Sequence, residues 1–244
     1  MPIILDEPFA TIVHGDWRET LAVAQERGGV DAVICDPPYS AKTHAGHDRQ
    51  AQNCAAEGLS VMDREIDYAA WHPSLVAAFV GETERVRGWR VVLTDDVLAP
   101  EWRCAFDASG LYAFRATPCV ISGMSARLSG DGPASESVFA MVARPRHEPF
   151  SRWGSLPGFY KGPREAVWRV GGKPTWLMTA LVRDYSKRGD VVCDPVCGGG
   201  QTGKAARILG RRFIGGDIDE KAARETARVV SAAREQLPLF EAGA

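Results

Sequence analysis

The sequence predicts an α/β fold in which helices cover both faces of a mixed β-sheet. Three short apolar runs each end on an aspartate: residues 30–35 before Asp36, 191–193 before Asp194, and 212–216 before Asp217. Stretches with helical periodicity lie between such runs, and strands that alternate with helices are typical of a largely parallel sheet. Because open sheets of this type bind ligands at the carboxyl ends of their strands, we expect the three aspartates to mark a functional edge.

In the N-terminal part of the chain, apolar periodicity and the residues that interrupt it define the elements. A short entry strand at residues 11–13 and an amphipathic helix at 17–27 lead into the strand at 30–35. Residues 41–67 are polar, rich in His, Gln, Asn and Gly, and have neither helical nor strand period. A loop of that length is usually functional or disordered, so we expect a mobile loop at about 40–67 beside the functional edge.

The remaining elements follow in chain order. We expect a helix at residues 68–80, a buried strand at 90–94, a helix at 102–109 that ends at Gly110, and an antiparallel pair of strands at 112–121 and 137–142 joined by a Ser- and Gly-rich loop. Next come a helix at 174–185, the strand at 191–193, a helix at 204–209 ended by Gly210, a strand at 212–217 and a charged amphipathic helix at 219–237. The antiparallel pair makes the expected sheet mixed.

Length and composition limit the class of protein. A chain of 244 residues with 45% hydrophobic content can bury one α/β core, so we expect a single catalytic domain over residues 1–244. No apolar run is long enough to span a bilayer, and no basic leader precedes a hydrophobic stretch, which indicates a soluble, unexported protein. The six cysteines show no C-x-x-C spacing, so we expect reduced thiols in the cytoplasm and no metal site.

The tetrad Asp36-Pro37-Pro38-Tyr39 is the most informative motif of the chain. Proline supplies no N–H and restricts the residue before it, so the strand stops here and the tetrad lies at its carboxyl end. The two prolines fix the backbone, so the Asp36 carboxylate and the Pro37 carbonyl can act as two acceptors for one small donor, such as an exocyclic amine. Tyr39 offers a flat face on which a base can stack, worth about 1–3 kcal/mol. In isolation, the tetrad is equally typical of a proline-rich turn.

A glycine-rich turn follows the second of these strands: Asp194-Pro195-Val196-Cys197-Gly198-Gly199-Gly200-Gln201-Thr202-Gly203. Glycines let the backbone pass close to a ligand, and Asp217 at the end of the next strand is placed to accept hydrogen bonds from ribose hydroxyls. The turn also satisfies the G-x-G-x-x-G pattern of dinucleotide sites, which is a weak match on its own. Asp194 ahead of the glycines suits a cationic or amine-bearing ligand better than a pyrophosphate.

Together the two motifs resemble those of the amino-methylating DNA methyltransferases, which use S-adenosylmethionine to methylate N6 of adenine or N4 of cytosine. In that family D-P-P-Y is the catalytic motif, and D-P-F-x-G-x-G, followed by a helix and an acid-tipped strand, is the cofactor motif. The catalytic motif comes first here, which is similar to the order of the beta group. The resemblance covers residues 15–219. It departs at Val196, where the family usually has Phe, so weaker packing against the cofactor is expected.

The resemblance implies a Rossmann-like methyltransferase fold with a mixed seven-stranded sheet. It implies that the catalytic residues are Asp36, Pro37, Pro38 and Tyr39. It also implies that the cofactor contacts Asp194, Pro195, Val196, Cys197, Gly198, Gly200, Gln201, Thr202 and Asp217. Lys173 lies in a segment similar to one that lines the methionine end of the cofactor pocket in the family. Asp16 would touch the adenine of the cofactor, unless it caps the helix that starts at Trp17.

The charge distribution matters more than the net charge of −2. From Arg144 to Arg188 basic residues outnumber acids, and aromatic residues lie among them. This pattern indicates a DNA-facing surface, although an ordinary solvated surface gives the same pattern. We expect a small DNA-recognition insertion at about 144–170. Contacts to double-stranded DNA are expected from Lys42, Arg144, Arg152, Lys161 and Arg164.

The resemblance implies transfer of a methyl group to N6 of a flipped-out adenine, because a base inside a duplex cannot reach such a site. Hydrogen bonds from the amine to Asp36 and to the Pro37 carbonyl would favour a pyramidal nitrogen, and the protein would mainly position the reactants. Asp36 favours adenine, since the N4-cytosine subgroup more often begins its tetrad with Ser. Members of this group serve restriction-modification or act alone, and they commonly dimerise, so a homodimer is compatible with the resemblance.

Several alternatives remain open at this stage. An N4-cytosine DNA methyltransferase is the nearest, and an RNA or protein amine methyltransferase could use a similar tetrad. An NAD(P)-binding oxidoreductase would explain the glycines and Asp217 but leaves the tetrad without a role. A catalytically silent binding protein would show a damaged motif. A cytosine C5-methyltransferase needs a cysteine nucleophile after a proline at a strand end, and Pro118-Cys119 lies inside a later predicted strand.

Overall fold

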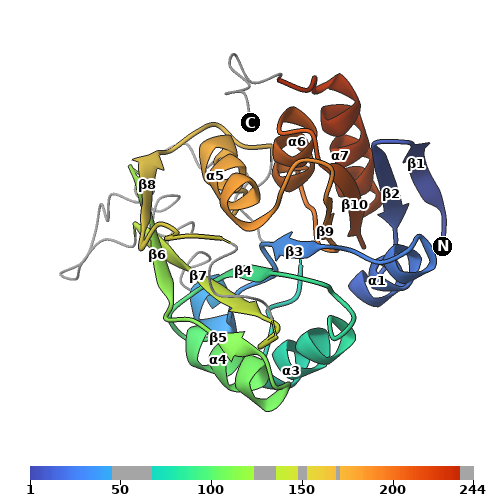
Figure 1. Cartoon of the computed structure of the whole chain (residues 1–244). Coiled ribbons are helices and arrows are strands. Elements are labelled where there is room, and N and C mark those ends of the chain that lie inside the picture. The colour runs from blue at the N-terminus through green and yellow to red at the C-terminus, as the bar shows by residue number, and fades with distance from the viewer. Residues whose placement is uncertain (46–67, 124–135, 148–152, 169–170, 237–244) are drawn as a thin grey trace. The chain divides into compact units, whose positions relative to one another are not determined.

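The computed structural model describes residues 1–45, 68–123, 136–147, 153–168 and 171–236 (Figure 1). The chain forms two compact units. Unit 1 comprises Met1–Cys35, Arg85–Trp89 and Thr175–Ala244, and unit 2 comprises Asp36–Glu84 and Arg90–Pro174. That they act as one catalytic domain, as the sequence predicts, stays a prediction. Among the described helices, none has the length and apolar character needed to cross a membrane.

Unit 1 is built on a sheet of mainly parallel strands. In spatial order these are β1 (Ile3–Glu7), β2 (Ala10–His14), β10 (Arg212–Asp217), β9 (Val191–Asp194) and β3 (Ala32–Cys35). The β1 strand runs antiparallel to β2, and the other neighbours are parallel. Every residue of β3 and β9 is buried, as expected for strands covered on both faces.

Helices cover both faces of the unit 1 sheet, namely α1 (Trp17–Glu26), α5 (Thr175–Tyr185), α6 (Gln201–Ile208) and α7 (Glu220–Ala232). Successive residues of a strand point to opposite faces. A side chain at Gly216 would collide with Thr20 of α1, whereas one at Gly203 of α6 would collide with Phe213, which points to the other face of β10. Figure 1 shows α1 on one side of the sheet and α6 and α7 on the other. The predicted arrangement is therefore confirmed.

Unit 2 contains the antiparallel part of the fold. Its strands, in spatial order, are β4 (Arg90–Thr94), β7 (Ser137–Arg144), β6 (Thr117–Ser122) and β8 (Tyr160–Pro163), and the short β5 (Tyr112–Ala113) also pairs with β7. The β6 and β8 strands are parallel, and the remaining pairs are antiparallel. The helices α3 (Pro73–Glu82) and α4 (Ala99–Ala108) contribute an aromatic core. In this core the ring centroids of Phe79 and Trp102 lie 5.7 Å apart.

The structure refines the predicted elements at several points. The described residues contain ten strands, because β1, β5 and β8 add to the seven expected. The strand predicted over residues 112–121 is divided into β5 and β6. The helix predicted at 68–80 begins at Pro73 instead, where proline suits the first helical turn because that position needs no N–H donor. Most of the predicted loops at 41–67 and 122–134 lies outside the described residues.

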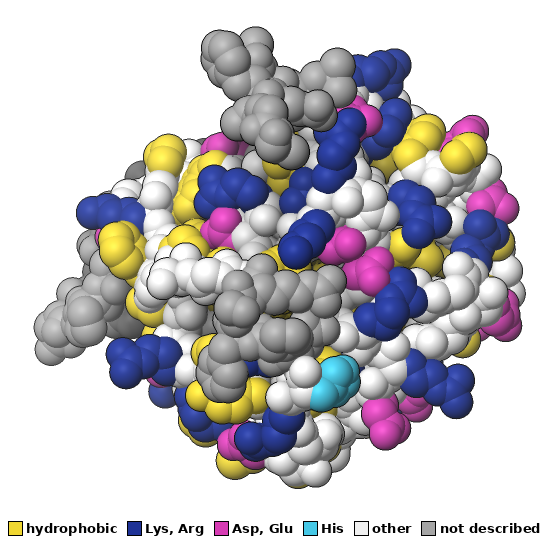
Figure 2. Space-filling view, in the orientation of Figure 1, with side chains coloured by type: hydrophobic (Ala, Val, Ile, Leu, Met, Phe, Trp, Pro, Cys, Tyr) yellow, Lys and Arg dark blue, Asp and Glu magenta, His cyan; other side chains and the backbone are white. Residues whose placement is uncertain are grey.

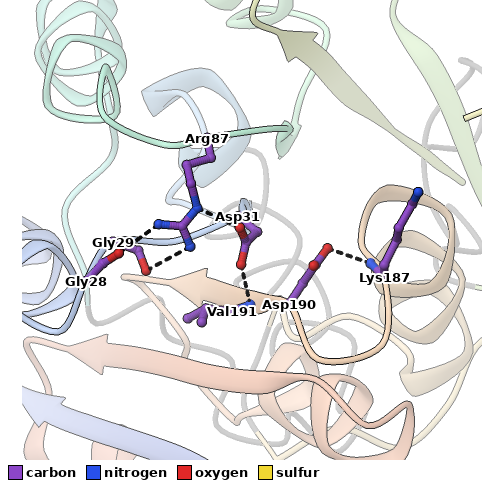
Figure 3. A network of polar contacts seen from close by, with 7 residues as sticks. All are labelled: Gly28, Gly29, Asp31, Arg87, Lys187, Asp190 and Val191. Carbon is purple, nitrogen blue, oxygen red and sulfur yellow. Dashed lines mark hydrogen bonds and ion pairs between the residues drawn. The ribbon is translucent and has the colours of Figure 1, made fainter. Parts of the chain in front are cut away.

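A polar network fixes the amino ends of β3 and β9 in unit 1 (Figure 3). Arg87 donates from Nε to Asp31 Oδ1 over 2.7 Å and from Nη1 to the Gly28 carbonyl over 2.7 Å. The other Asp31 oxygen accepts from Val191 N over 2.8 Å. Burial raises the pKa of Asp31, but the hydrogen bonds from Arg87 and Val191 outweigh it and leave that pKa below its usual range. The network lies at the opposite ends of these strands from Asp36 and Asp194.

Candidate functional site

Unit 2 holds the tetrad, and Asp36 is its most constrained side chain. Lys173 Nζ donates to Asp36 Oδ2 over 2.7 Å, and the Tyr39 hydroxyl donates to Asp36 Oδ1 over 2.9 Å. The Asp36 side chain is 22% exposed. Because an ionised carboxylate has about four acceptor sites, a side chain that receives these two donors can accept further hydrogen bonds. The tetrad therefore presents an oriented acceptor, and its role as a catalytic motif stays a prediction.

Lys173 lies against the tetrad. Its side chain is 5% exposed, and Nζ also donates to the Gly171 carbonyl over 2.7 Å. The same Nζ lies 4.8 Å from the centroid of the Tyr39 ring, within the range of a cation–π contact. The sequence suggested Lys173 as a cofactor ligand; in the structure its ammonium contacts the Asp36 carboxylate of the tetrad.

The protonation of the tetrad follows from burial and from these contacts. Burial raises the pKa of Asp36 above its ordinary value, and the ion pair with Lys173 and the hydrogen bond from Tyr39 limit that rise without cancelling it. Burial and the neighbouring Asp36 charge also raise the pKa of Tyr39 well above its ordinary value. Tyr39 is therefore a neutral donor at neutral pH, and it can orient Asp36 but cannot neutralise it.

Asp95 anchors the chain that follows the tetrad, a role that sequence reasoning missed. It lies directly after β4 and is 7% exposed. Its Oδ2 accepts from Ser40 N over 3.0 Å, from Ser40 Oγ over 2.5 Å and from Thr43 Oγ1 over 2.6 Å, while Oδ1 accepts from Leu98 N over 2.9 Å. The signal in the sequence was an aspartate at another strand end. Because Ser40 follows Tyr39, Asp95 fixes the position of the tetrad.

Unit 1 holds the glycine-rich turn, which Asp194 organises from within. Asp194 is 2% exposed, and its oxygens accept from Val196 N over 3.2 Å and from Thr202 Oγ1 over 2.5 Å. Gly200 has a φ of 81° at the start of α6, and a Cβ there would lie 2.9 Å from the Thr226 Cα. This glycine is therefore required both by its backbone conformation and by the close approach of α7.

Asp217 lies beside this turn at the end of β10. Its oxygens accept from Gly198 N over 2.9 Å and from Asp219 N over 3.0 Å, and the residue is 8% exposed. Val196, Gly198 and Gly199 are half-buried, whereas Pro195 and Cys197 are buried. The partly exposed side of the turn thus consists of Val196, Gly198 and Gly199, next to the Asp217 carboxylate. Such a set of groups fits a ligand that bears hydroxyl donors.

Two other predicted cofactor ligands have partners within unit 1. Asp16 caps α1, with its side chain accepting from Arg18 N over 2.9 Å while Glu19 accepts from Asp16 N over 2.8 Å. The sequence left open whether Asp16 caps this helix, and the structure shows that it does. The Gln201 side chain accepts from Thr175 Oγ1 over 2.8 Å. A role for either residue in binding cofactor stays a prediction.

The predicted DNA contacts are placed unevenly. Lys42, Lys161 and Arg164 are exposed, and Arg152 lies outside the described residues. Arg144 is only 5% exposed, with its guanidinium 5.6 Å from the Tyr112 ring centroid, which does not fit the expected surface contact to phosphate. On the face drawn in Figure 2, basic and acidic side chains are interspersed. Within the described residues, the expected contacts therefore depend on Lys42, Lys161 and Arg164.

Cys119 was the candidate nucleophile of the cytosine C5 alternative. It is fully buried in β6, and burial raises the pKa of its thiol to about 12. Only the thiolate is nucleophilic, so Cys119 is inert at neutral pH. This environment argues against the cytosine C5 alternative.

Comparison with known proteins supports the family that the motifs indicate. Residues 167–228 match the model of the N6/N4 methylase family, described as DNA methylase. The Type II methyltransferase M2.DpnII of Streptococcus pneumoniae is 43% identical over 49 residues, which are 20% of this chain and 18% of that protein. The chain thus spans less than a fifth of the curated relative that it matches. Both matches support the amino-methylating DNA methyltransferase family.

Solved structures match over nearly the whole chain. The crystal structure of the M1.HpyAVI complex with S-adenosylmethionine has a TM-score of 0.65 and 17% identity, and the match covers 90% of this chain and 98% of that one. The PvuII DNA methyltransferase, which is cytosine-N4-specific, has a TM-score of 0.63 and 12% identity, with 90% and 86% covered. At these identities the likeness concerns the fold, and the predicted Rossmann-like methyltransferase fold is confirmed.

Proposed function

We propose that this chain, which matches the amino-methylating DNA methyltransferases in its C-terminal part, is an S-adenosylmethionine-dependent DNA methyltransferase that modifies N6 of a flipped-out adenine. The observation that carries the proposal is the Asp36 carboxylate. Lys173 and Tyr39 each donate one hydrogen bond to it, so it is oriented by the protein and retains acceptor sites for an incoming amine. A proline-rich turn without function would not need a buried cation on its acid.

The fit of unit 1 to the cofactor supports the same proposal. Asp217 would accept from the ribose hydroxyls, because the backbone N–H groups of Gly198 and Asp219 hold its carboxylate in place. Asp194 would act from inside the turn by keeping Val196 and Thr202 in position. When bound, the cofactor supplies an electrophilic methyl group on a sulfonium, and the residues of this chain need only hold and orient it.

The tetrad would prepare the acceptor amine. The lone pair of an exocyclic amine is delocalised into the ring, so two hydrogen bonds from its protons, to Asp36 and to the Pro37 carbonyl, would favour a pyramidal nitrogen that can form a bond to carbon. Tyr39 would contribute a stacking face, worth about 1–3 kcal/mol against the cost of extruding the base. A neutral Tyr39 and an inert Cys119 are consistent with a reaction without a covalent enzyme intermediate.

N4 of cytosine is the second candidate. Its exocyclic amine offers the same pair of donors, and the fold likeness to the cytosine-N4-specific PvuII enzyme favours keeping it. Asp36 instead of Ser at the start of the tetrad favours adenine. Double-stranded DNA is the proposed substrate in both cases.

The decisive experiment incubates the full chain with methyl-labelled S-adenosylmethionine and duplex DNA, and identifies the labelled nucleoside after digestion. N6-methyladenine is the expected product, and N4-methylcytosine would replace the first candidate with the second. Asp36→Ala should abolish transfer while cofactor binding, measured by calorimetry, persists. If Asp36→Ala retained wild-type turnover, or if label appeared only in RNA or protein, the proposal would be wrong.

A further inference from the structure

The ion pair between Lys173 and Asp36 joins two residues that are 137 positions apart in the chain. The ammonium has three donors, and two of them reach Asp36 Oδ2 and the Gly171 carbonyl, each over 2.7 Å. With only 5% of its side chain exposed, Lys173 has lost most of its hydration, which is costly unless the charge is paired. The Asp36 carboxylate is that pair.

We propose that Lys173 is a positioning residue of the acceptor site, whose ammonium keeps Asp36 an ionised acceptor for the amine of the target base. This inference rests on the proposed function and deepens it. An ionised carboxylate has acceptors alone, whereas a protonated one carries an O–H donor. Such a donor would oppose one of the N–H groups of the amine. The charge of Lys173 thus decides whether Asp36 can bind the substrate.

The other groups that face Asp36 cannot supply this charge. The Tyr39 hydroxyl is a neutral donor, and Tyr68, which lies near Tyr39, is likewise a phenol and not a cation. The Cys119 thiol interacts with both Asp36 and Lys173, and it is neutral because burial raises its pKa to about 12. Among the described groups that act on Asp36, Lys173 carries the positive charge. Without it, only the hydrogen bond from Tyr39 would oppose burial, and burial favours the protonated form of Asp36.

A purely structural role for Lys173 makes a different prediction. If the ion pair only held residues 171–173 against the tetrad, its loss would lower activity by the same factor at every pH. If Lys173 keeps Asp36 ionised, its loss moves the acid limb of the activity–pH profile to higher pH and does not change the activity on the alkaline plateau. The two roles are therefore separable by titration.

The first test measures the ionisation of Asp36 directly, without any reaction. The protein is labelled with ¹³C at the aspartate carboxyls, the Asp36 resonance is identified by its absence in Asp36→Asn, and its titration midpoint is followed by NMR. In Lys173→Met the midpoint should rise by about one unit or more, which is a tenfold change in the acid dissociation constant.

Two variants serve as controls for this shift. Lys173→Arg keeps the charge, so its Asp36 midpoint should stay near that of the wild type. Lys221→Met, which removes an exposed lysine of α7, should leave the Asp36 midpoint unchanged. Equal midpoints in wild type and Lys173→Met would overturn the proposal.

The second test uses methyl transfer to duplex DNA. The acid limb of kcat/KM should shift in Lys173→Met by the same interval as the NMR midpoint, and a uniform loss at all pH values would refute the charge role. Should Lys173→Met fail to fold, Lys173→Gln, which keeps a hydrogen-bond donor but not the charge, takes its place in both tests. Its Asp36 midpoint and its acid limb should rise as expected for Lys173→Met, and wild-type values in a folded Lys173→Gln would overturn the proposal. If the wild type methylates nothing, the proposed function fails, while the NMR titration still decides the ion pair.

Discussion

Asp36 and Asp217 both end a buried strand, but the protein holds their carboxylates in different ways. Asp36 receives its hydrogen bonds from two side chains, Lys173 and Tyr39. Asp217 receives its bonds from the backbone N–H groups of Gly198 and Asp219. Backbone donors carry no net charge and do not titrate, so these two bonds make Asp217 a fixed acceptor. Side-chain donors make Asp36 adjustable by pH and by substitution.

Asp217→Asn tests the fixed acceptor. An amide has one acceptor oxygen instead of two, so its NH2 group would face a backbone N–H and leave it without a partner. We expect cofactor affinity to fall by about 1–3 kcal/mol, which is roughly a tenfold to hundredfold rise in Kd, measured by calorimetry with S-adenosylmethionine. Asp107→Asn, on the exposed side of α4, is the matched control. Unchanged affinity in Asp217→Asn would contradict the role given to Asp217.

The residues of the site differ in how far the sequence could predict them. The tetrad and the glycine turn were predictable because each is contiguous and has a local physical signature. The contacts of Lys173 with Asp36 and of Asp95 with Ser40 were not, because they span 137 and 55 positions and depend on how the strands are arranged. Arg144 was expected at the surface because it is charged, but it ends a strand whose last residues are buried.

At the scale of elements, replacing glycine by alanine should have opposite effects on the free energy of unfolding at Gly200 and at Gly81. Gly200→Ala would force a side chain into a positive φ and against Thr226, so we expect a loss of about 1–3 kcal/mol in the free energy of unfolding. Gly81→Ala, in α3 with nothing near its Cβ position, should gain about 0.5–1 kcal/mol. Urea denaturation measures both. Equal effects of the two substitutions would show that the local backbone does not decide them.

Asp95 links the end of β4 to the tetrad, and it makes the stability of unit 2 depend on pH. Burial raises its pKa, but the hydrogen bonds from Ser40, Thr43 and Leu98 outweigh this and lower that pKa below the ordinary value. The folded state therefore binds the proton more weakly than the unfolded state does. The stabilisation is complete above the unfolded pKa of about 4, and it is lost as the pH falls through the lower folded value.

Asp95→Asn should remove this acid-dependent stabilisation. We expect a loss of about 1–3 kcal/mol at neutral pH, shrinking towards zero below the folded pKa, when wild type and variant are compared by urea denaturation over a pH series. Methyl transfer should slow as well, because Ser40 loses its anchor. A constant difference between the two proteins at all pH values would show that the carboxylate charge is not the cause.

The elements that sequence predicted well are those with a continuous apolar run. The β4 strand was predicted with its observed bounds, and β3, β9 and β10 were predicted to within two residues. The β8 strand was missed because its residues, YKGP, include Gly and Pro, which have low strand propensity. An edge strand tolerates them because one side needs no ladder hydrogen bonds. Pairing with β6 therefore makes residues 160–163 a strand, although their own strand propensity is low.

At the scale of the molecule, unit 1 is assembled from three separate segments of the chain. The network of Figure 3 contains residues of all three segments, and three of them link the segments: Asp31 from Met1–Cys35, Arg87 from Arg85–Trp89, and Val191 from Thr175–Ala244. Asp31 is the only one of the three that bonds both others. The Asp31 carboxylate therefore joins Arg87 of the short middle segment to the first residue of β9, while backbone bonds such as Val33 N to the Trp89 carbonyl, over 2.9 Å, attach that segment to β3.

Removing the Arg87 or the Asp31 side chain should separate two contributions to stability: the ion pair between them, and the hydrogen bond from Val191 N to Asp31. Arg87 is 49% exposed and Asp31 is 28% exposed, so solvent screens their ion pair, and Arg87→Met should cost only about 1 kcal/mol. Asp31→Ala also leaves the buried Val191 N–H without its partner, so its cost should be larger, about 1–3 kcal/mol. Arg85→Met, at an exposed position in the same segment, provides the control for urea denaturation. Because the Asp31 pKa is lowered in the folded state, the difference between wild type and Asp31→Ala should fall away in acid. If Arg87→Met lost as much free energy of unfolding as Asp31→Ala, the stabilisation would come from the ion pair with Arg87 and not from the hydrogen bond with Val191 N at the start of β9.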